Sequence, residues 1–354
     1  MQCLAKHGSK VTFVNTEFTH KRVMNALSGK DNIEDHIHLV SIPDGLEPWE
    51  DRNEVGKLTE SIFHVMPGKL EELIENINGS DKDKITCIVA DELLGWALEV
   101  AEKMQIKRAA VWSTAAALLA LGFRIPELLD DGIIDNNGTP TKNQMIQLSP
   151  TMPAISTTHF VWACIGDLAT QKTFFEVHFW QAIDLEIQQA TSGQKTQLAW
   201  NGLINSQPTQ SSMLHLEASQ FFDQIQFQEL ALGLELTNKP FLWVVRPDLT
   251  DDNNDAYPKG FKKSSNSWAN GLSNGIPFLC WPYFADQFFN QSYICDVWKV
   301  GLGFNCDENG IVKQGEIKDK VQQLFNDKTF KARSLDLKEV VSKSAKEGGC
   351  SHSQ

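Results

Sequence analysis

Short apolar runs of strand length alternate with amphipathic stretches along the first half of the chain, and this alternation constrains the fold more than any other feature. The expected strands are Val11–Asn15, His38–Pro43, Ile85–Ala90 and Arg108–Trp112, and the expected helices are Glu54–Ile77, Leu94–Met104 and Thr114–Phe123. Alternation of this kind is typical of a parallel sheet with helices on both faces. The sequence therefore predicts an α/β fold.

The longest predicted helix, Glu54–Ile77, contains a proline near its middle. Apolar residues recur at helical spacing on both sides of it, for example at Leu58 and Ile74. A proline inside a helix removes one backbone hydrogen bond and crowds the preceding turn. We therefore expect Pro67 and Gly68 to kink or break this helix.

The second half of the chain also has an α/β pattern, but with few strands. The expected strands are Phe241–Val245 and Ile276–Pro282, and the expected helices are Glu229–Thr237, Gln287–Trp298, Gln314–Asn326 and Lys328–Ala345. A doubly wound domain normally has about five or six strands. The sequence therefore predicts that the second domain is incomplete.

Length and charge limit the possible functions. At 354 residues the chain has the length of about two domains, which we place at residues 1–195 and 196–354. Acidic residues outnumber basic ones by 45 to 32, giving a formal net charge of −13. Proteins that bind bulk nucleic acid or anionic membranes have the opposite balance. We therefore expect no nucleic-acid partner.

Location and metal content are also suggested by the sequence. No apolar run reaches the roughly eighteen residues that span a bilayer, and the first residues lack the apolar stretch of a signal peptide. The seven cysteines include no C-x-x-C pair, and no two histidines have metal-ligand helical spacing. We expect a cytoplasmic protein with reduced cysteines, no membrane span and no metal. Cys87 and Cys280 lie in apolar runs and are expected to be buried.

Polar residues follow two predicted strands at their carboxyl ends, where open parallel sheets bind ligands. Asp91 directly follows Ile85–Ala90, and Asp286 and Gln287 come shortly after Ile276–Pro282. A carboxylate in such a place can orient a catalytic histidine or accept protons from hydroxyl groups. The alternative for Asp286 is a helix N-cap.

Ser113 and Thr114 follow the strand that ends at Trp112. Their hydroxyl groups could contact a ligand. Strand-to-helix turns also favour hydroxyl residues as helix caps, so both interpretations remain open.

Several strings resemble the plant UDP-dependent glycosyltransferases of small molecules. The strings are Leu4–Gly8, Val11–Phe18, Val40–Leu46, Val89–Asp91, Ile225–Leu230, Phe241–Arg246, Tyr257–Phe261 and Asn274–Pro282 with Asp286, Gln287 and Asn290. The last string is similar to the second half of the family's nucleotide-sugar signature. The resemblance covers nearly the whole chain apart from about residues 193–222.

The resemblance implies a GT-B fold, in which two Rossmann-like domains face a cleft. It implies inverting transfer of a hexose, such as glucose, from a UDP-sugar to a hydroxyl group of a small acceptor. By this resemblance Asp91 orients the catalytic histidine, Asp286 and Gln287 bind sugar hydroxyls, and Ser113 touches the sugar. The UDP-sugar is a co-substrate, so we expect no cofactor, and we expect a monomer.

The sequence departs from the family pattern at several places. The family's histidine lies in a loop after the first strand, and this sequence starts beyond that loop, so we expect the first strand and the base to be absent. Phe261 is followed by Lys262–Gly271 instead of the Trp-x-Pro-Gln and His-Cys-Gly-Trp-Asn-Ser segments that bind uracil, diphosphate and ribose. The strand expected shortly before Ile225 and the closing helix after Gly349 are also missing.

These departures predict a truncated and internally deleted glycosyltransferase whose activity is lost or strongly impaired. General-base catalysis alone is worth about 10²–10⁴ in rate. The alternatives are a remnant that binds a small molecule without catalysis, and a product that does not fold stably.

Overall fold

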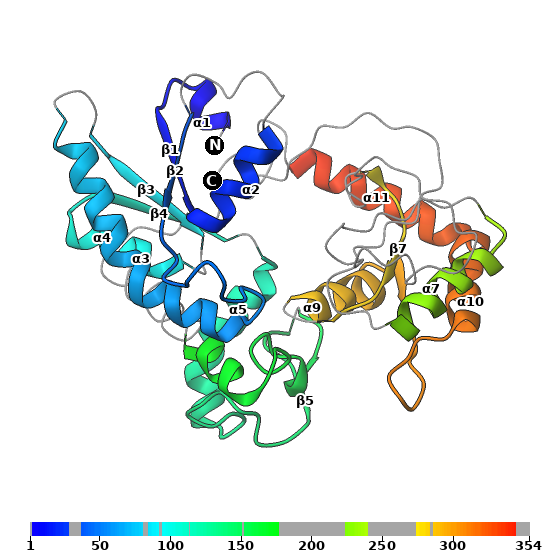
Figure 1. Cartoon of the computed structure of the whole chain (residues 1–354). Helices are drawn as coiled ribbons and strands as arrows, with labels where there is room; N and C mark the ends of the chain where they lie inside the picture. Colours follow the sequence, from blue (N-terminus) through cyan, green and yellow to red (C-terminus); the bar gives the residue numbers. More distant parts are fainter. Residues whose placement is uncertain are drawn as a thin grey trace. The chain divides into compact units, whose positions relative to one another are not determined.

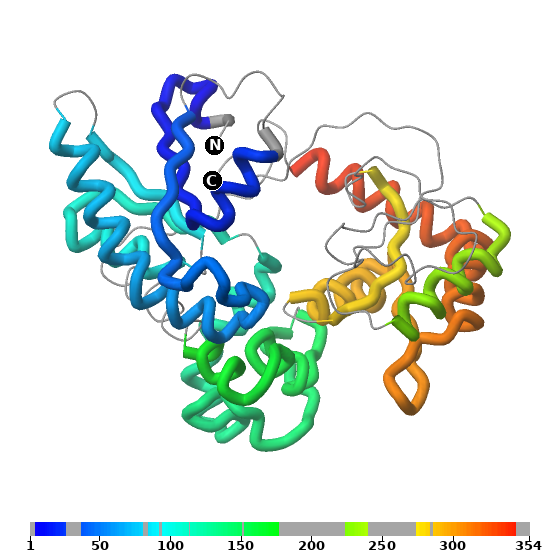
Figure 2. Tube along the Cα trace, viewed as in Figure 1, coloured from blue at the N-terminus to red at the C-terminus, as the bar shows by residue number. Residues whose placement is uncertain are grey.

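The computed structural model describes residues 2–27, 37–80, 84–91, 94–112, 114–150, 152–176, 224–239, 274–283 and 286–344. The chain divides into two compact units, Met1–Gln144 with Ser156–Gly193 and Met145–Ile155 with Gln194–Gln354. Figure 2 follows the trace of the described segments along the sequence. The predicted domain boundary at residues 195 and 196 and the predicted strand Phe241–Val245 lie outside the described residues.

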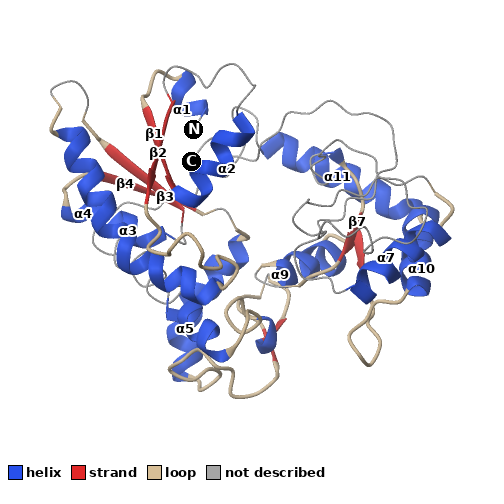
Figure 3. Cartoon of the chain, in the orientation of Figure 1, coloured by secondary structure: helices blue, strands red, loops and turns tan. Residues whose placement is uncertain are grey.

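The first unit contains two pairs of parallel strands (Figure 3). Strand β1 (Val11–Thr16) pairs with β2 (Ile37–Ile42), and β3 (Cys87–Asp91) pairs with β4 (Lys107–Val111). Each parallel pair is joined by a connection that includes a helix, as parallel strands require. The α/β prediction and all four strands predicted for this half are confirmed.

Up to residue 130, the helices of the first unit alternate with its strands (Figure 1), and the three that follow β2 overlap predicted helices. They are α1 (Gln2–Lys6), α2 (Glu17–Leu27), α3 (Val55–Asn78), α4 (Gly95–Lys103) and α5 (Ala116–Asp130). Helix α3 runs through Pro67 without a break. Its buried residues Met66, Leu70 and Ile74 continue one apolar stripe across the proline, and burial of that stripe offsets the hydrogen bond lost at Pro67.

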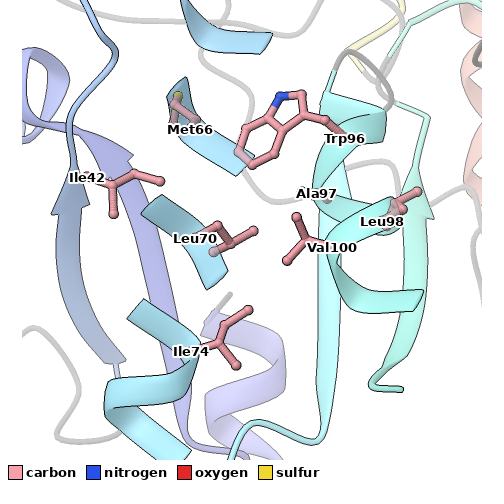
Figure 4. Packing of buried hydrophobic residues seen from close by; sticks show 9 residues of the cluster. Ile42, Met66, Leu70, Ile74, Trp96, Ala97, Leu98 and Val100 are labelled. Atoms are coloured by element: carbon pink, nitrogen blue, oxygen red, sulfur yellow. The ribbon is translucent and has the colours of Figure 1, made fainter. Parts of the chain in front are cut away.

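One hydrophobic cluster joins strands and helices in the first unit (Figure 4). Its buried members are Ile42, Met66, Leu70, Ile74, Ala90, Trp96, Ala97, Leu98 and Val100. In Figure 4 the side chains of α3 lie between Ile42 of β2 and Val100 of α4. Burying a side chain of this size stabilises the fold by about 1.5–3 kcal/mol, so this cluster fixes β2 and β3 relative to the two helices.

The side chains of β3 alternate between solvent and core. Cys87 and Val89 are exposed, whereas Ala90 is buried. The prediction that Cys87 is buried is therefore wrong, because alternate residues of a strand point to opposite faces and Cys87 shares the exposed face with Val89. Cys280, for which the same prediction was made, is half-buried.

The stretch after α5 contains little regular structure among its described residues. Its elements are β5 (Met145–Ile146), β6 (Ile155–Ser156), the 3₁₀ turn η2 (Thr157–His159) and a helix over residues 168–176. The buried indole N–H of Trp162 donates to the carbonyl of Gly138 at 2.7 Å. Gly138 has a φ of +78°, and a Cβ there would overlap the ring of Phe175, so a side chain at this position is excluded.

The second unit contains one described pair of parallel strands, β7 (Phe278–Cys280) and β8 (Gly301–Gly303). Its helices are α7 (Gln224–Leu236), α9 (Gln287–Ser292) with the π-helical turn η5 (Tyr293–Val297), α10 (Gln314–Asn326) and α11 (Lys328–Ser344). Leu230 and Leu234 of α7 form a core with Ile317 and Val321 of α10. The predicted helices α10 and α11 are confirmed, and β8 was not predicted.

Within the described ranges, no helix is both long and apolar enough to cross a bilayer.

Candidate functional site

Asp91 is the last residue of β3, at the carboxyl end of the strand. It lies in register with Val111, the last residue of β4. The preceding residue, Ala90, is buried in the hydrophobic cluster, and Asp91 itself is half-buried. The fold therefore holds this carboxylate at the edge of a parallel sheet, where ligands of α/β proteins bind.

The turn after β4 is closed by a side chain. The indole N–H of Trp112 donates to the carbonyl oxygen of Ala115 at 3.1 Å, just before α5 begins. Ser113, the residue that the resemblance assigns to sugar contact, lies outside the described residues. Its role stays a prediction.

Asp286 occupies the N-cap position of α9, but its carboxylate does not cap the helix. The carboxylate Oδ2 instead accepts a hydrogen bond from Asn290 Nδ2 at 3.1 Å. Asn290 is four residues further along the helix, on the same face. The N-cap alternative is thus not realised by the side chain, and Asn290 holds the carboxylate in place.

Gln287 is fixed by a contact to the backbone. Its Oε1 accepts a hydrogen bond from the backbone N–H of Tyr283 at 2.7 Å. Because a backbone N–H can only donate, the side-chain oxygen must face it, and the Nε2 end of the amide is a donor group. Asp286 and Gln287 thus supply an acceptor and a donor side by side at the start of α9, on the carboxyl side of β7.

The aromatic residues around this segment have different roles. The ring of Trp281 packs against Phe304, with centroids 5.1 Å apart. Phe289 is completely buried, and Tyr283 is exposed. Phe289 is therefore part of the core, whereas Tyr283 lies at the surface.

The resemblance included Asn290 in the nucleotide-sugar signature but gave it no role, and its contact to Asp286 was not predicted. The signal that could have predicted this contact is the i,i+4 spacing of an acidic residue and an amide at a helix start.

The predicted site residues lie in both units. Asp91 belongs to the first unit, and Asp286 and Gln287 belong to the second. Of the predicted site residues, Asp286 and Gln287 are brought together as neighbours on one helix.

Comparison with known proteins identifies relatives over nearly the whole chain. UDP-glycosyltransferase 83A1 of Arabidopsis thaliana is 38% identical, over 98% of this chain and 89% of that protein. (R)-mandelonitrile beta-glucosyltransferase of Prunus dulcis is 22% identical, over 98% of this chain and 89% of that protein. No protein-family profile matches the chain.

The alignment with the Arabidopsis relative is longer than the part of this chain that it covers. It extends over 414 positions, whereas 98% of 354 residues is about 347, so about 67 aligned positions have no counterpart in this chain. These gaps fall between aligned segments that together cover nearly the whole chain.

Solved structures of plant enzymes have the same fold. Os79 of O. sativa, crystallised with UDP, matches with a TM-score of 0.68 and 18% identity over 99% of this chain and 93% of that chain. Phytolacca americana UGT2, crystallised with UDP-2fluoro-glucose and pterostilbene, matches with a TM-score of 0.68 and 16% identity over 97% of both chains. The fold is therefore GT-B, as the resemblance implied. The identity to the Arabidopsis protein and its coverage show that this chain belongs to the plant UDP-glycosyltransferases.

Proposed function

We propose that this chain contains the donor-sugar subsite of an inverting transferase, which moves a hexose from a UDP-sugar to a hydroxyl group of a small molecule. The single observation that carries the proposal is the fixed pair at the start of α9. Asp286 is held by Asn290, and Gln287 is held by the backbone of Tyr283. The side chains that would meet the sugar are therefore set before any ligand binds.

The chemistry of the pair suits a neutral hexose. Each sugar hydroxyl both donates and accepts hydrogen bonds, so it is satisfied by a carboxylate next to an amide donor. A carboxylate acceptor makes the stronger contact, about 1.5–3 kcal/mol. Glucose is the hexose we propose, since the Prunus relative is a glucosyltransferase by name.

Asp91 has the role of a positioning residue in this proposal. A carboxylate beside an imidazole fixes its tautomer and stabilises the imidazolium that forms when it takes a proton. The acceptor hydroxyl loses its proton to the base as its oxygen attacks the anomeric carbon. The bond to UDP breaks on the opposite side, so the configuration at that carbon inverts. The proposal assigns no residue as the base.

We further propose that turnover by this chain is strongly reduced. The residues after Phe261, Lys262–Gly271, lack the segments that in the resembled family bind uracil, diphosphate and ribose. Each lost charge-assisted contact removes about 1.5–3 kcal/mol of binding, so two losses lower donor affinity by at least about 100-fold. The roughly 67 unmatched positions in the alignment support an internal loss. Residues 262–271 lie outside the described residues.

The experiment combines calorimetric binding of UDP-glucose and of UDP with an assay of UDP release. Phenolic and terpenoid alcohols serve as acceptors. We expect weak but measurable binding of UDP-glucose, no binding of UDP alone, and no UDP release above the acceptor-free background. Robust turnover would contradict the proposed impairment.

Two variants test the subsite separately from turnover. Asp286→Asn and Gln287→Ala should each weaken UDP-glucose binding by about 10-fold, the loss of one hydrogen bond to a sugar hydroxyl. Asp319→Asn, an exposed position of α10, is the matched control and should bind like the parent chain. No detectable UDP-glucose binding by the parent chain, or unchanged binding by both variants, would overturn the subsite.

A second candidate function is binding of an acceptor-like small molecule without catalysis. The observation that favours it is the first unit's packed core, which joins β2 and β3 to α3 and α4. Phenolic or terpenoid ligands would then raise the melting temperature while UDP and UDP-glucose leave it unchanged. A melting shift with UDP-glucose would count against this candidate.

A further inference from the structure

The indole N–H of Trp96 is buried in the first unit without a hydrogen-bond partner among the described residues. Trp96 is only 6% exposed and belongs to the hydrophobic cluster that joins β2 and β3 to α3 and α4. An indole N–H can only donate a hydrogen bond. Most buried donors in proteins are paired, because an unpaired donor has lost its bond to water without a replacement. This unused donor therefore calls for an explanation.

Two other tryptophans of the first unit show how the fold satisfies such a group. Trp162 donates to the carbonyl oxygen of Gly138 at 2.7 Å, and Trp112 donates to that of Ala115 at 3.1 Å. In both cases a backbone carbonyl of a loop or helix start accepts the bond. The N–H of Trp96 has no such acceptor among the described residues, so it is left for a partner from outside the chain.

The N–H lies near the edge of the sheet where ligands of α/β proteins bind. Trp96 is the second residue of α4, which begins shortly after β3 ends at Asp91. Leu94, at the N-cap position of α4, has no polar side chain to cap the helix. In Figure 4 the nitrogen lies on the edge of the ring that faces away from Leu70 and Val100, toward the end of α4 where the helix begins. The donor is thus directed away from the centre of the cluster.

The surroundings of the N–H define the ligand that it fits. The ring of Trp96 and the side chain of Met66, which lies beside it in Figure 4, form an apolar wall with a single donor. Sites for small molecules are built in this way, mostly from apolar side chains with a few polar groups that fix the orientation. An N–H pairs only with an acceptor atom, such as a carbonyl or hydroxyl oxygen. The carboxylate of Asp91, at the end of β3, disfavours an anion.

We propose that Trp96 Nε1 donates a hydrogen bond to an uncharged oxygen of a mostly apolar ring compound, which binds at the carboxyl end of β3. The bond selects compounds that carry such an oxygen over hydrocarbons of the same shape. The nitrogen is covered in this structure, so binding includes a small local opening. That the compound is the acceptor of the transfer rests on the proposed function, and Trp96 is then a residue that determines acceptor specificity. The binding itself needs no donor sugar.

The test uses two ring compounds of nearly the same shape as probes. Carvone has a ketone oxygen, and limonene lacks it. Calorimetric titration of the full chain measures the dissociation constant of each compound. We expect carvone to bind about 3- to 10-fold more tightly than limonene, which is the effect of one neutral hydrogen bond. Equal dissociation constants, or no binding of carvone, would overturn the proposal.

The variant Trp96→Phe keeps an aromatic ring and removes the N–H, so it should bind carvone and limonene with equal affinity. Trp162→Phe is the matched control, because it removes an N–H that is already bonded to Gly138, and it should keep the preference for carvone. Both variants lose the same ring atoms, but only Trp162→Phe also loses a hydrogen bond. Its melting temperature should therefore be the lower of the two, by about 2–4 °C. A Trp96→Phe chain that still prefers carvone would assign the contact to another group and overturn the proposal.

Nuclear magnetic resonance of the ¹⁵N-labelled parent chain follows the N–H directly. Carvone should shift one indole N–H resonance that limonene leaves in place, and this resonance should be absent from the spectrum of Trp96→Phe. Circular dichroism shows whether that variant folds; if it does not, the parent chain still decides, because a carvone-bound donor at Trp96 requires a shifted indole resonance. If carvone shifts none, or shifts one that Trp96→Phe retains, Trp96 is not the donor. A chain that binds carvone in this way but does not bind UDP-glucose would support this site and contradict the donor subsite.

Discussion

Arg52 donates hydrogen bonds to both carboxylate oxygens of the buried Asp44, from Nε to Oδ2 at 3.0 Å and from Nη2 to Oδ1 at 3.1 Å. The same guanidinium donates to three carbonyl oxygens of the loop between β2 and α3, those of Leu46, Glu47 and Glu50. All the N–H donors of the Arg52 guanidinium are thus used on Asp44 and this loop. This pair thus fixes the loop that leads into the central helix of the first unit.

Removing one partner of this pair should cost much of the stability of the first unit. In the variant Asp44→Ala the guanidinium stays largely buried without its counter-ion, so the free energy of unfolding should fall by about 3 kcal/mol. Urea denaturation measures the change. The matched control is Glu72→Ala, which removes the exposed pair with Lys69 and should cost less than about 0.5 kcal/mol. Equal losses in the two variants would contradict the argument.

Gly301 should not tolerate a side chain. A Cβ at this position would lie 2.8 Å from the carbonyl oxygen of Phe278, a backbone atom that is part of the strand pairing and cannot move aside. Gly301→Ala should therefore lower the free energy of unfolding by about 2 kcal/mol, as for other overpacked sites. Thermal and urea unfolding give the value.

The control for this prediction is Gly315 in α10, where a Cβ would meet nothing within 4 Å. Gly315→Ala should stabilise the chain slightly, by at most about 1 kcal/mol, because alanine favours the helix more than glycine does. A Gly301→Ala chain that unfolds like the Gly315→Ala chain would show that the strand can move away from the added methyl group.

Much of the first unit could be predicted because its signals are local and periodic. The apolar run around Cys87–Asp91 and the alternation with helices were enough to place Asp91 at the carboxyl end of a parallel strand. The same reasoning gave the bounds of α10 and nearly those of α11, whose apolar residues recur at helical spacing. Signals of this kind depend only on neighbours along the chain.

The features that sequence reasoning missed depend on contacts far along the chain. Strand β8 has glycine at two of three positions, a composition that local propensity assigns to a turn, and it forms because Gly301–Gly303 fits between β7 and η5. Helix α3 continues through Pro67 because its apolar stripe is buried against β2 and α4. The exposure of Cys87 was missed because an apolar run does not show which face of a strand is covered.

The carboxylate of Asp307 is expected to stabilise the fold in a pH-dependent way. It accepts backbone hydrogen bonds from Ile311 at 2.8 Å and Asn309 at 2.9 Å, and it pairs with Lys313 at 3.4 Å. The hydrogen bond from Ile311 is the main reason that the pKa of Asp307 lies below the ordinary aspartate value of 3.8. A carboxyl group whose pKa is lowered by folding stabilises the native state above its unfolded pKa, and that stability is lost as the pH falls through the folded pKa.

The variant Asp307→Asn should therefore unfold more easily than the parent chain at neutral pH, and the difference should shrink as the pH falls below 3.8. Urea unfolding at about pH 7 and about pH 3 measures it. Asp319→Asn, at an exposed position of α10, should show no such trend. A difference that grows toward low pH would have the wrong sign for the argument.

Asn290 should control sugar binding without touching the sugar, because it holds the Asp286 carboxylate through Nδ2. Removing the amide in Asn290→Ala frees that carboxylate to turn, so UDP-glucose affinity should fall by about 3- to 10-fold. Asn290→Asp places a second negative charge at i,i+4 from Asp286 and should weaken binding further, because like charges at this spacing repel. Asn290→Gln keeps an amide donor and should recover part of the loss, which a purely structural role of Asn290 would not produce. Calorimetric titration gives the order of the UDP-glucose affinities of the three variants, and melting temperatures are measured alongside. If all three variants bind UDP-glucose alike at equal stability, Asn290 does not position Asp286 for the donor.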